Sequence, residues 1–199
     1  MQSNLALNHQ QEFTYGDYLT WPDDERWQII DGIAYNMSPA PNLDHQFILS
    51  ELHLQFGIYL KDKTCRIFTS PVDVVFPKQN EDIKDVKDVV QPDIIIVCDH
   101  KKIKSHKHCA GSPDLVIEIL SPSTGKLDLK DKLKLYEREG VKEYWVVYPN
   151  DKMIHVYMLE DNKYKFPEIY TAEDKIKVGT FPDLEIDLSP VFREYIQES

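Results

Sequence analysis

Two acidic residues interrupt apolar stretches of the sequence that otherwise predict buried β-strands. Asp93 begins the apolar run at 93–98, and Glu118 lies inside the run at 114–120. An ionised carboxylate in a buried strand is costly unless it is paired, hydrogen-bonded or bound to a metal. Two such carboxylates that converge at one sheet can hold Mg²⁺, which takes one or two carboxylates and keeps several waters. The alternative readings are a strand-initiating turn for Asp93 and a buried ion pair for Glu118.

A lysine on the next predicted helix adds a third group of chemical interest. Lys132 stands four residues after Asp128 and four before Tyr136, so the three share one helix face. One reading is an exposed ion pair between Asp128 and Lys132. The other is a lysine that points back over the preceding strand toward Glu118. In both readings we expect Lys132 at the edge of the surface, where it contributes little stability.

Metal sites and nucleophiles of other kinds find little support in the sequence. The segment 106–109 (His-Lys-His-Cys) is crowded, and no second Cys/His pair follows at zinc-finger spacing. P-loop, GxGxxG, HExxH and GxSxG motifs are absent from the sequence. Cys65, Cys98 and Cys109 are far apart and lack CxxC spacing, which favours a reduced, intracellular protein. Cys98 is most simply a small buried hydrophobe.

Composition limits the class of protein. The chain has 199 residues, 42% of them hydrophobic, which predicts one domain with a sizeable core. No run approaches the ~20 apolar residues of a membrane helix, and no signal peptide is visible at the start. A net charge of −11 argues against simple electrostatic binding of nucleic acid. The lysines that could contact a nucleic-acid backbone are Lys101, Lys102, Lys104, Lys107, Lys126, Lys130 and Lys134.

The candidate residues must be positioned by a mixed arrangement of helices and strands. Asp-Gly at 31–32 predicts a hairpin within 27–38, and helical periodicity follows over 42–62 and 126–139. Apolar, β-branched runs predict strands at 65–76, 93–98, 114–120 and 143–148, with a hairpin partner at 153–159. Edge strands and a short final helix follow. This order predicts a mixed α/β sheet.

Several ordered stretches of the sequence resemble a known family. They are QPDIIIV at 91–97, GSPDLVIEILSPST at 111–124, D-x-x-x-K-x-x-x-Y at 128–136, GVKEYWVVYP at 140–149 and IIDGIAYNMSPAP-x₃-HQ at 29–46. Together they are similar to the putative restriction endonuclease domain family, within the PD-(D/E)XK nuclease-like superfamily. The resemblance predicts an N-terminal tail at 1–11, a single restriction-endonuclease-like domain at 12–190 and a C-terminal helix or tail at 191–199. Its implied fold is α/β, with a mixed four-stranded sheet flanked by helices and additional N-terminal and C-terminal strands.

The resemblance also implies a set of catalytic residues. Asp93 is implied as the acid of the PD motif and Glu118 as the second acid, and the backbone carbonyl of Ile119 is implied as a further metal ligand. The superfamily usually has its lysine two residues after the second acid, where this chain has Leu120. Lys132 then corresponds to a lysine moved onto the following helix.

Further positions match the family or depart from it. Asp73 and His45 match family positions and are additional candidates without an assigned role. Gln28 departs from the family, which often has Glu there.

The function implied by the resemblance is a Mg²⁺-dependent (or Mn²⁺-dependent) endonuclease that hydrolyses phosphodiester bonds, with DNA as the expected substrate. The metal would activate a water and neutralise the phosphate, and Lys132 would orient the water or stabilise developing charge. We expect a cytoplasmic homodimer without membrane contact, by analogy with nucleases that pair to cut two strands. The alternative is a catalytically inactive nuclease-like binding or regulatory module, which the acidic charge, Leu120 and Gln28 favour.

Overall fold

A large mixed sheet forms the centre of the protein. The computed structural model describes residues 11–22, 24–37, 42–121 and 127–194. The strand order of the large sheet is β11-β10-β9-β8-β6-β3, with β12 also paired to β10. β8 and β9 run parallel, and the other pairs are antiparallel. The strands are β3 (Arg66–Thr69), β6 (Ile94–Val97), β8 (Leu115–Ile119), β9 (Glu143–Tyr148), β10 (Met153–Glu160), β11 (Lys163–Tyr164) and β12 (Glu168–Thr171).

A second sheet is built mainly from the N-terminal half of the chain, in the order β2-β1-β5-β4-β7. Its predicted hairpin is present, and Asp31 and Gly32 both have positive φ, as a tight two-residue turn requires. The strands are β1 (Trp27–Ile30), β2 (Ile33–Asn36), β4 (Asp73–Val75), β5 (Val89–Val90) and β7 (His108–Ala110). A separate ribbon pairs β13 (Lys175–Lys177) with β14 (Glu185–Asp187).

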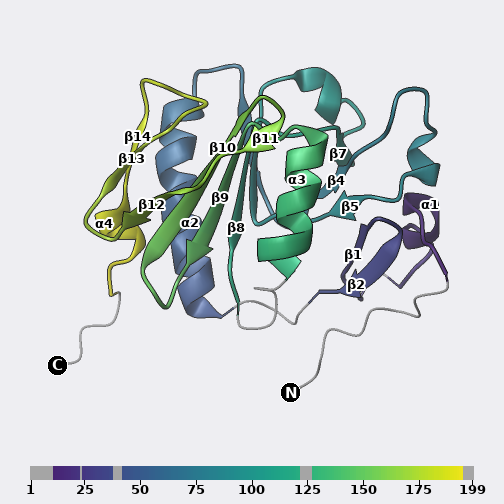
Figure 1. Cartoon of the computed structure of the whole chain (residues 1–199), viewed down its shortest axis with the longest axis horizontal. Coiled ribbons are helices and arrows are strands. Elements are labelled where there is room, and N and C mark those ends of the chain that lie inside the picture. The colour runs from purple at the N-terminus through teal and green to yellow at the C-terminus, as the bar shows by residue number, and fades with distance from the viewer. Residues whose placement is uncertain (1–10, 23, 38–41, 122–126, 195–199) are drawn as a thin grey trace.

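Helices cover both faces of the large sheet (Figure 1). α2 (Leu43–Leu60) packs on one face, with Asn42 capping its N-terminus. α3 (Leu133–Glu139) packs on the other face and ends at Gly140, whose φ of 79° suits glycine. A π-helical turn, Leu127–Lys132, precedes α3. The remaining helices are short: α1 (Tyr15–Tyr18), α4 (Leu188–Val191), η1 (Ile83–Asp85) and η2 (His100–Ile103).

The side chains of β6 and β8 alternate between two hydrophobic clusters, so each strand is covered on both sides. Ile94, Ile96 and Ile117 belong to the cluster under α2, which also contains Leu52 and Phe56. The intervening residues belong to the cluster under α3, which also takes in the inner face of the second sheet; they are Ile95, Val97 and Val116. By this alternation Glu118 falls on the α3 face.

Most predicted elements are present, with local differences. The stretch 65–76 is two strands, separated by a cis Ser70–Pro71 peptide. The helix predicted at 126–139 begins as a π-helical turn, and the final helix is a single turn. The large sheet has a four-stranded core of β3, β6, β8 and β9, and the C-terminal segment adds β10, β11 and β12 to the outside of β9, as the predicted additional C-terminal strands do. Among the described residues, no helix is long and apolar enough to span a membrane.

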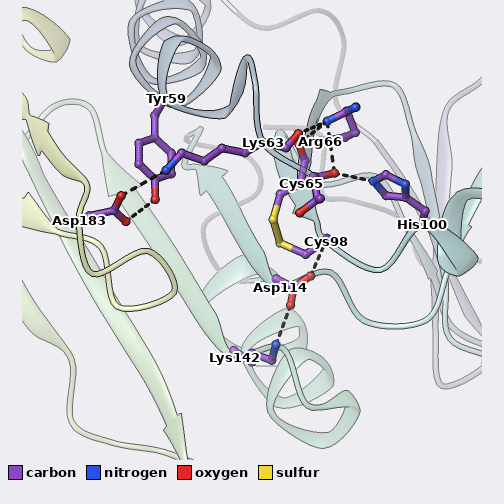
Figure 2. Close-up of a disulfide and its surroundings, with 10 residues drawn as sticks. Tyr59, Lys63, Cys65, Arg66, Cys98, His100, Asp114, Lys142 and Asp183 are labelled. Atoms are coloured by element: carbon purple, nitrogen blue, oxygen red, sulfur yellow. Dashed lines mark hydrogen bonds and ion pairs between the residues drawn. A yellow bond between two sulfur atoms is a disulfide. The ribbon is translucent and has the colours of Figure 1, made fainter.

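The expected reduced state of the cysteines is wrong for two of them in this structure. Cys65 and Cys98 form a disulfide (Figure 2). Cys109 is free and buried. The β3–β6 register explains the pairing, because Arg66 lies opposite Val97 and the next residues outward are the two cysteines. Cys65 and Cys98 are 33 residues apart in the sequence, so their spacing does not indicate that they lie opposite each other on neighbouring strands.

Candidate functional site

A buried cluster of three polar side chains joins β8 to α3. The Lys132 ammonium lies 2.9 Å from Glu118 Oε1, and the Tyr136 hydroxyl donates to the same oxygen at 2.6 Å. Lys132 and Tyr136 are one helical turn apart, so both reach over β8 from the same side. Glu118 and Lys132 are each 3% exposed, which contradicts the expected surface-edge position of the lysine. The π-helical turn that ends at Lys132 is a rare geometry that recurs at functional sites.

Asp93 lies beside this cluster at the beginning of β6. Its Oδ2 accepts a hydrogen bond from the backbone N–H of Ile119 at 2.8 Å and lies 3.2 Å from His45 Nε2. Extending the β6–β8 register by one residue places Asp93 opposite Glu118. The strands are therefore neighbours, as expected, and the Asp93 carboxylate lies at the Glu118–Ile119 peptide. Asp93 contacts α2 through His45, whereas Glu118 contacts Lys132 and Tyr136 on the α3 side.

His45 belongs to the first turn of α2, where the helix cap fixes it. The Asn42 side chain accepts a hydrogen bond from the His45 backbone N–H at 2.9 Å. The imidazole is buried, with Nε2 toward Asp93. Within the described part of the chain its Nδ1 has no hydrogen-bond partner. His45 is thus placed to orient the Asp93 carboxylate.

Gln28 adds a second buried polar atom without a partner among the described residues, its Oε1. The side chain is 2% exposed and lies on the same face of β1 as Ile30, which shares a hydrophobic cluster with Tyr136. Tyr35, directly opposite Gln28 across the hairpin, lies near the π-helical turn. Burial raises the pKa of Tyr35, and the charge of Asp131 in that turn raises it further. Gln28 therefore faces the side of the second sheet that packs toward α3.

A polar network, which sequence reasoning missed, holds the chain just before Asp93. The Arg26 guanidinium donates to Gln91 Oε1 at 2.9 and 3.1 Å and to Ser70 Oγ at 2.7 Å. The Ser70 N–H in turn donates to the backbone carbonyl of Asp93 at 3.0 Å. Arg26 thereby ties β1 to both segments that precede Asp93 in space. The sequence signal was weak, because a single arginine before a hairpin gives no hint of its partners.

Asp73 does not join Asp93 and Glu118. It accepts hydrogen bonds from Tyr15 at 3.3 Å, Tyr18 at 3.2 Å and Gln91 at 2.8 Å. Asp73 lies on the same face of β4 as Val75, away from the cluster under α3. Burial, reinforced by the Asp73 charge, raises the pKa of Tyr18 to about 12. Asp73 reaches the candidate site only indirectly, through Gln91.

The candidate backbone-binding lysines are divided between two regions. Lys101 and Lys102 belong to η2, which follows the end of β6 opposite to Asp93. Lys130 and Lys134 are exposed near the start of α3, close to Lys132 in sequence. Lys126 and the side chain of Asp128 lie outside the described residues, and with them the Asp128–Lys132 pair considered above.

The donor atoms suit Mg²⁺ in part. In the described portion of the chain, no three His, Cys, Asp or Glu side chains form a group that could hold a metal ion. Mg²⁺ needs only one or two carboxylates, and it prefers oxygen. The hydrogen bonds of Asp93 with Ile119 and His45 both involve Oδ2, and the buried Oε1 of Gln28 is a neutral oxygen donor. Asp93 and Glu118 on neighbouring strands, and Gln28 on the face of β1 that packs toward α3, carry oxygen donors of the kind that this ion prefers.

Comparisons with known proteins agree with the fold and with the sequence resemblance. The Uma2 family, described as "Putative restriction endonuclease", matches residues 15–189. An uncharacterized protein of Synechocystis sp. is 27% identical over 165 residues, covering 81% of this chain and 82% of that protein. A crystal structure of a putative nuclease belonging to DUF820 from Anabaena variabilis superposes with a TM-score of 0.70. It is 20% identical and covers 90% of this chain and 97% of its own, which confirms the predicted nuclease-like fold class.

Proposed function

This chain belongs to the Uma2 family of putative restriction endonucleases, and from that membership and the site we propose that it is a Mg²⁺-dependent endonuclease acting on DNA. The coarser conclusion is a nuclease-like protein of that family. The metal, the DNA substrate and the action as a homodimer are the proposed parts. Mn²⁺ is the natural substitute for Mg²⁺ at an oxygen-rich site.

The observation that carries the proposal is the buried Glu118–Lys132 pair beside the carboxylate of Asp93. Burying a charged pair is often no more stabilising than apolar packing of the same volume. A pair of this kind next to a second acid, at the ends of two neighbouring strands, is therefore better explained by chemistry than by stability.

The residues divide into ligands and positioning groups. Asp93 and Glu118, with the carbonyl of Ile119, would hold the ion. When bound, Mg²⁺ supplies charge neutralisation at the phosphate and a nucleophilic water near neutral pH. Lys132 would orient that water or stabilise negative charge as it develops. His45 orients Asp93 through Nε2.

The test combines metal binding with cleavage. Calorimetry with Mg²⁺ or Mn²⁺ should give binding that Asp93→Asn and Glu118→Gln each abolish. A supercoiled plasmid incubated with the protein and Mg²⁺ should be nicked or linearised, and Lys132→Met should reduce the rate by about 10²-fold or more. The matched control is Glu185→Gln, which changes an exposed carboxylate on β14. This variant should bind the metal and cleave the plasmid as the parent does. Metal binding without cleavage of any DNA or RNA substrate would instead favour the inactive binding module.

We also propose a cytoplasmic location, which the disulfide makes testable. Reducing compartments keep most thiols free. Cells quenched in acid, then denatured and alkylated without reduction before mass spectrometry, should then yield protein modified at all three cysteines. Modification of Cys109 alone would mean that the Cys65–Cys98 disulfide persists and that the compartment is oxidising.

A further inference from the structure

The outer face of α2 is apolar along most of its length. Among the described residues, the exposed large hydrophobic side chains include Leu43 (73% exposed), Leu54 (54%) and Ile58 (69%). With the half-buried Phe47 they fall on one stripe, because 43, 47, 54 and 58 are separated by steps of four, seven and four residues. The opposite side of α2 packs Ile48, Leu52, Phe56 and Leu60 into the core. A helix that is apolar on both sides is typical of a buried helix, so the exposed side chains of Leu43, Leu54 and Ile58 call for a partner.

We propose that this stripe, defined as Leu43, Phe47, Ser50, Leu54, Gly57 and Ile58, is the interface at which α2 pairs with α2 of a second copy of this chain. The copies would be antiparallel, about a two-fold axis near Ser50 and Glu51. The proposal names a surface for the homodimer suggested above. It does not depend on DNA cleavage, because self-association is measured without any substrate.

The stripe is complementary to itself when it is reversed. With the axis between 50 and 51, Leu43 of one copy meets Ile58 of the partner, and Phe47 meets Leu54. Ser50 and Gly57 are small, so they allow the two helix backbones to approach closely. A closed two-fold interface needs this self-complementarity, since the same patch serves both copies.

Charges at the ends of the helix fit the same arrangement. Asp44 lies at the N-terminal end of α2 and Lys61 directly follows its C-terminal end, so an antiparallel pair brings each Asp44 near the partner's Lys61. The opposed helix dipoles also favour antiparallel packing. Glu51, near the axis, lies 3.9 Å from Arg193 of its own chain, which offsets repulsion between the two Glu51 carboxylates.

The interface involves one helix from each copy. Such a pair buries less than the roughly 800 Å² per partner of a standard interface. We therefore expect a dissociation constant on the order of micromolar rather than nanomolar. Figure 1 shows α2 on the face of the large sheet away from α3, so the helix that would pair is not the one that contacts Glu118.

Sedimentation equilibrium of the full chain from 1 to 200 μM tests the proposal. The mass should rise from 23.3 kDa toward twice that value. Leu54→Glu with Ile58→Glu should raise the dissociation constant by at least about 100-fold, because four carboxylates would be buried in the apolar interface. Ile169→Glu is the matched control, since Ile169 is 53% exposed on β12, away from α2. The proposal would be overturned if the protein stayed monomeric over the whole concentration range. It would also be overturned if Ile169→Glu raised the dissociation constant as much as the double glutamate variant.

Two further variants keep the test decisive if the glutamate variants fold poorly. Ser50→Cys places a thiol beside the axis, and mild oxidation should link the copies faster than it links Leu19→Cys, whose position is also exposed. Asp44→Lys and Lys61→Asp should each weaken the dimer, and the double exchange should restore it. If the variant with both exchanges dimerised no more tightly than either single variant, the antiparallel pairing would be excluded.

Discussion

Replacing Lys132 by methionine tests whether the Glu118–Lys132 pair is as buried as the structure indicates. Methionine keeps most of the apolar stem and removes the charge. Both side chains are 4% exposed, and the ion pair is 2.9 Å long. Removing one partner of a buried pair leaves an uncompensated charge, at a cost of about 3–5 kcal/mol. The Tyr136 hydroxyl still donates to Glu118 Oε1, so we expect the lower end of that range, about 3 kcal/mol.

Urea unfolding, followed by the fluorescence of the buried Trp145, measures this loss. With a slope of about 2–3 kcal/mol/M, a loss of about 3 kcal/mol moves the midpoint down by roughly 1–1.5 M. Glu118→Gln together with Lys132→Met removes both charges, and we expect its stability within about 1 kcal/mol of the parent. Lys165→Met breaks an ion pair to Glu160 in which both side chains are more than half exposed, and its cost should stay below about 1 kcal/mol.

The comparison has a clear negative outcome. Lys132→Met could lower the free energy of unfolding no more than Lys165→Met does, or the double variant could be as unstable as Lys132→Met alone. Either result would show that Glu118 and Lys132 do not form a buried, coupled ion pair. Mg²⁺ adds a second readout. An ion held by Asp93 and Glu118 would supply the missing positive charge, so Mg²⁺ should raise the midpoint of Lys132→Met.

Three other predictions follow from the site and its surroundings. Gln28→Leu should leave the free energy of unfolding within about 1 kcal/mol of the parent, because the buried Oε1 of Gln28 has no partner among the described residues. Calorimetry should show weaker Mg²⁺ binding by this variant. A large loss of stability would mean that the Gln28 oxygen is hydrogen-bonded in the folded protein. Arg26→Met should fold by circular dichroism yet bind Mg²⁺ about 10-fold more weakly, since it holds the chain before Asp93, and unchanged affinity would exclude that role. Asp73→Asn should lower the pKa of Tyr18 from about 12 toward 10, as read by absorbance at 295 nm. Because folding favours protonated Tyr18, its contribution to stability is present below pH 10 and is lost as pH rises toward 12, and Asp73→Asn should flatten that decline.

The elements of the fold could be predicted because their signals are local. The Asp31-Gly32 turn, the Asn42 cap and the Gly140 helix end each depend on neighbouring residues only. The largely apolar runs at 93–98 and 114–120 indicated strands covered on both sides. The β9–β10 hairpin was predicted, but the pairing of β11 and β12 with β10 could not be, because it depends on contacts that the sequence does not specify.

The candidate site was predicted in its acids and its lysine but not in its supports. Asp93 and Glu118 were recognisable because carboxylates are rare in apolar strands. The burial of Lys132 was missed, since i,i+4 spacing alone favours a solvated pair. The contacts of Arg26 with Gln91 and Ser70 join three separate stretches of the chain, and only the tertiary structure brings them together. The roles of these residues, and the domain limits at 12–190, stay predictions.

The placement of Lys132 on a helix affects how relatives of this protein can be recognised. A lysine on β8 would have to keep a fixed two-residue distance from Glu118. A lysine in the helical turn that leads into α3 needs only to stay four residues before Tyr136, since both side chains meet on the same Glu118 oxygen. The connection between β8 and the helix is then free to gain or lose residues during evolution. Searches for distant members should therefore look for an acid inside an apolar run, followed at variable distance by K-x-x-x-Y, rather than for a lysine fixed two residues after the acid.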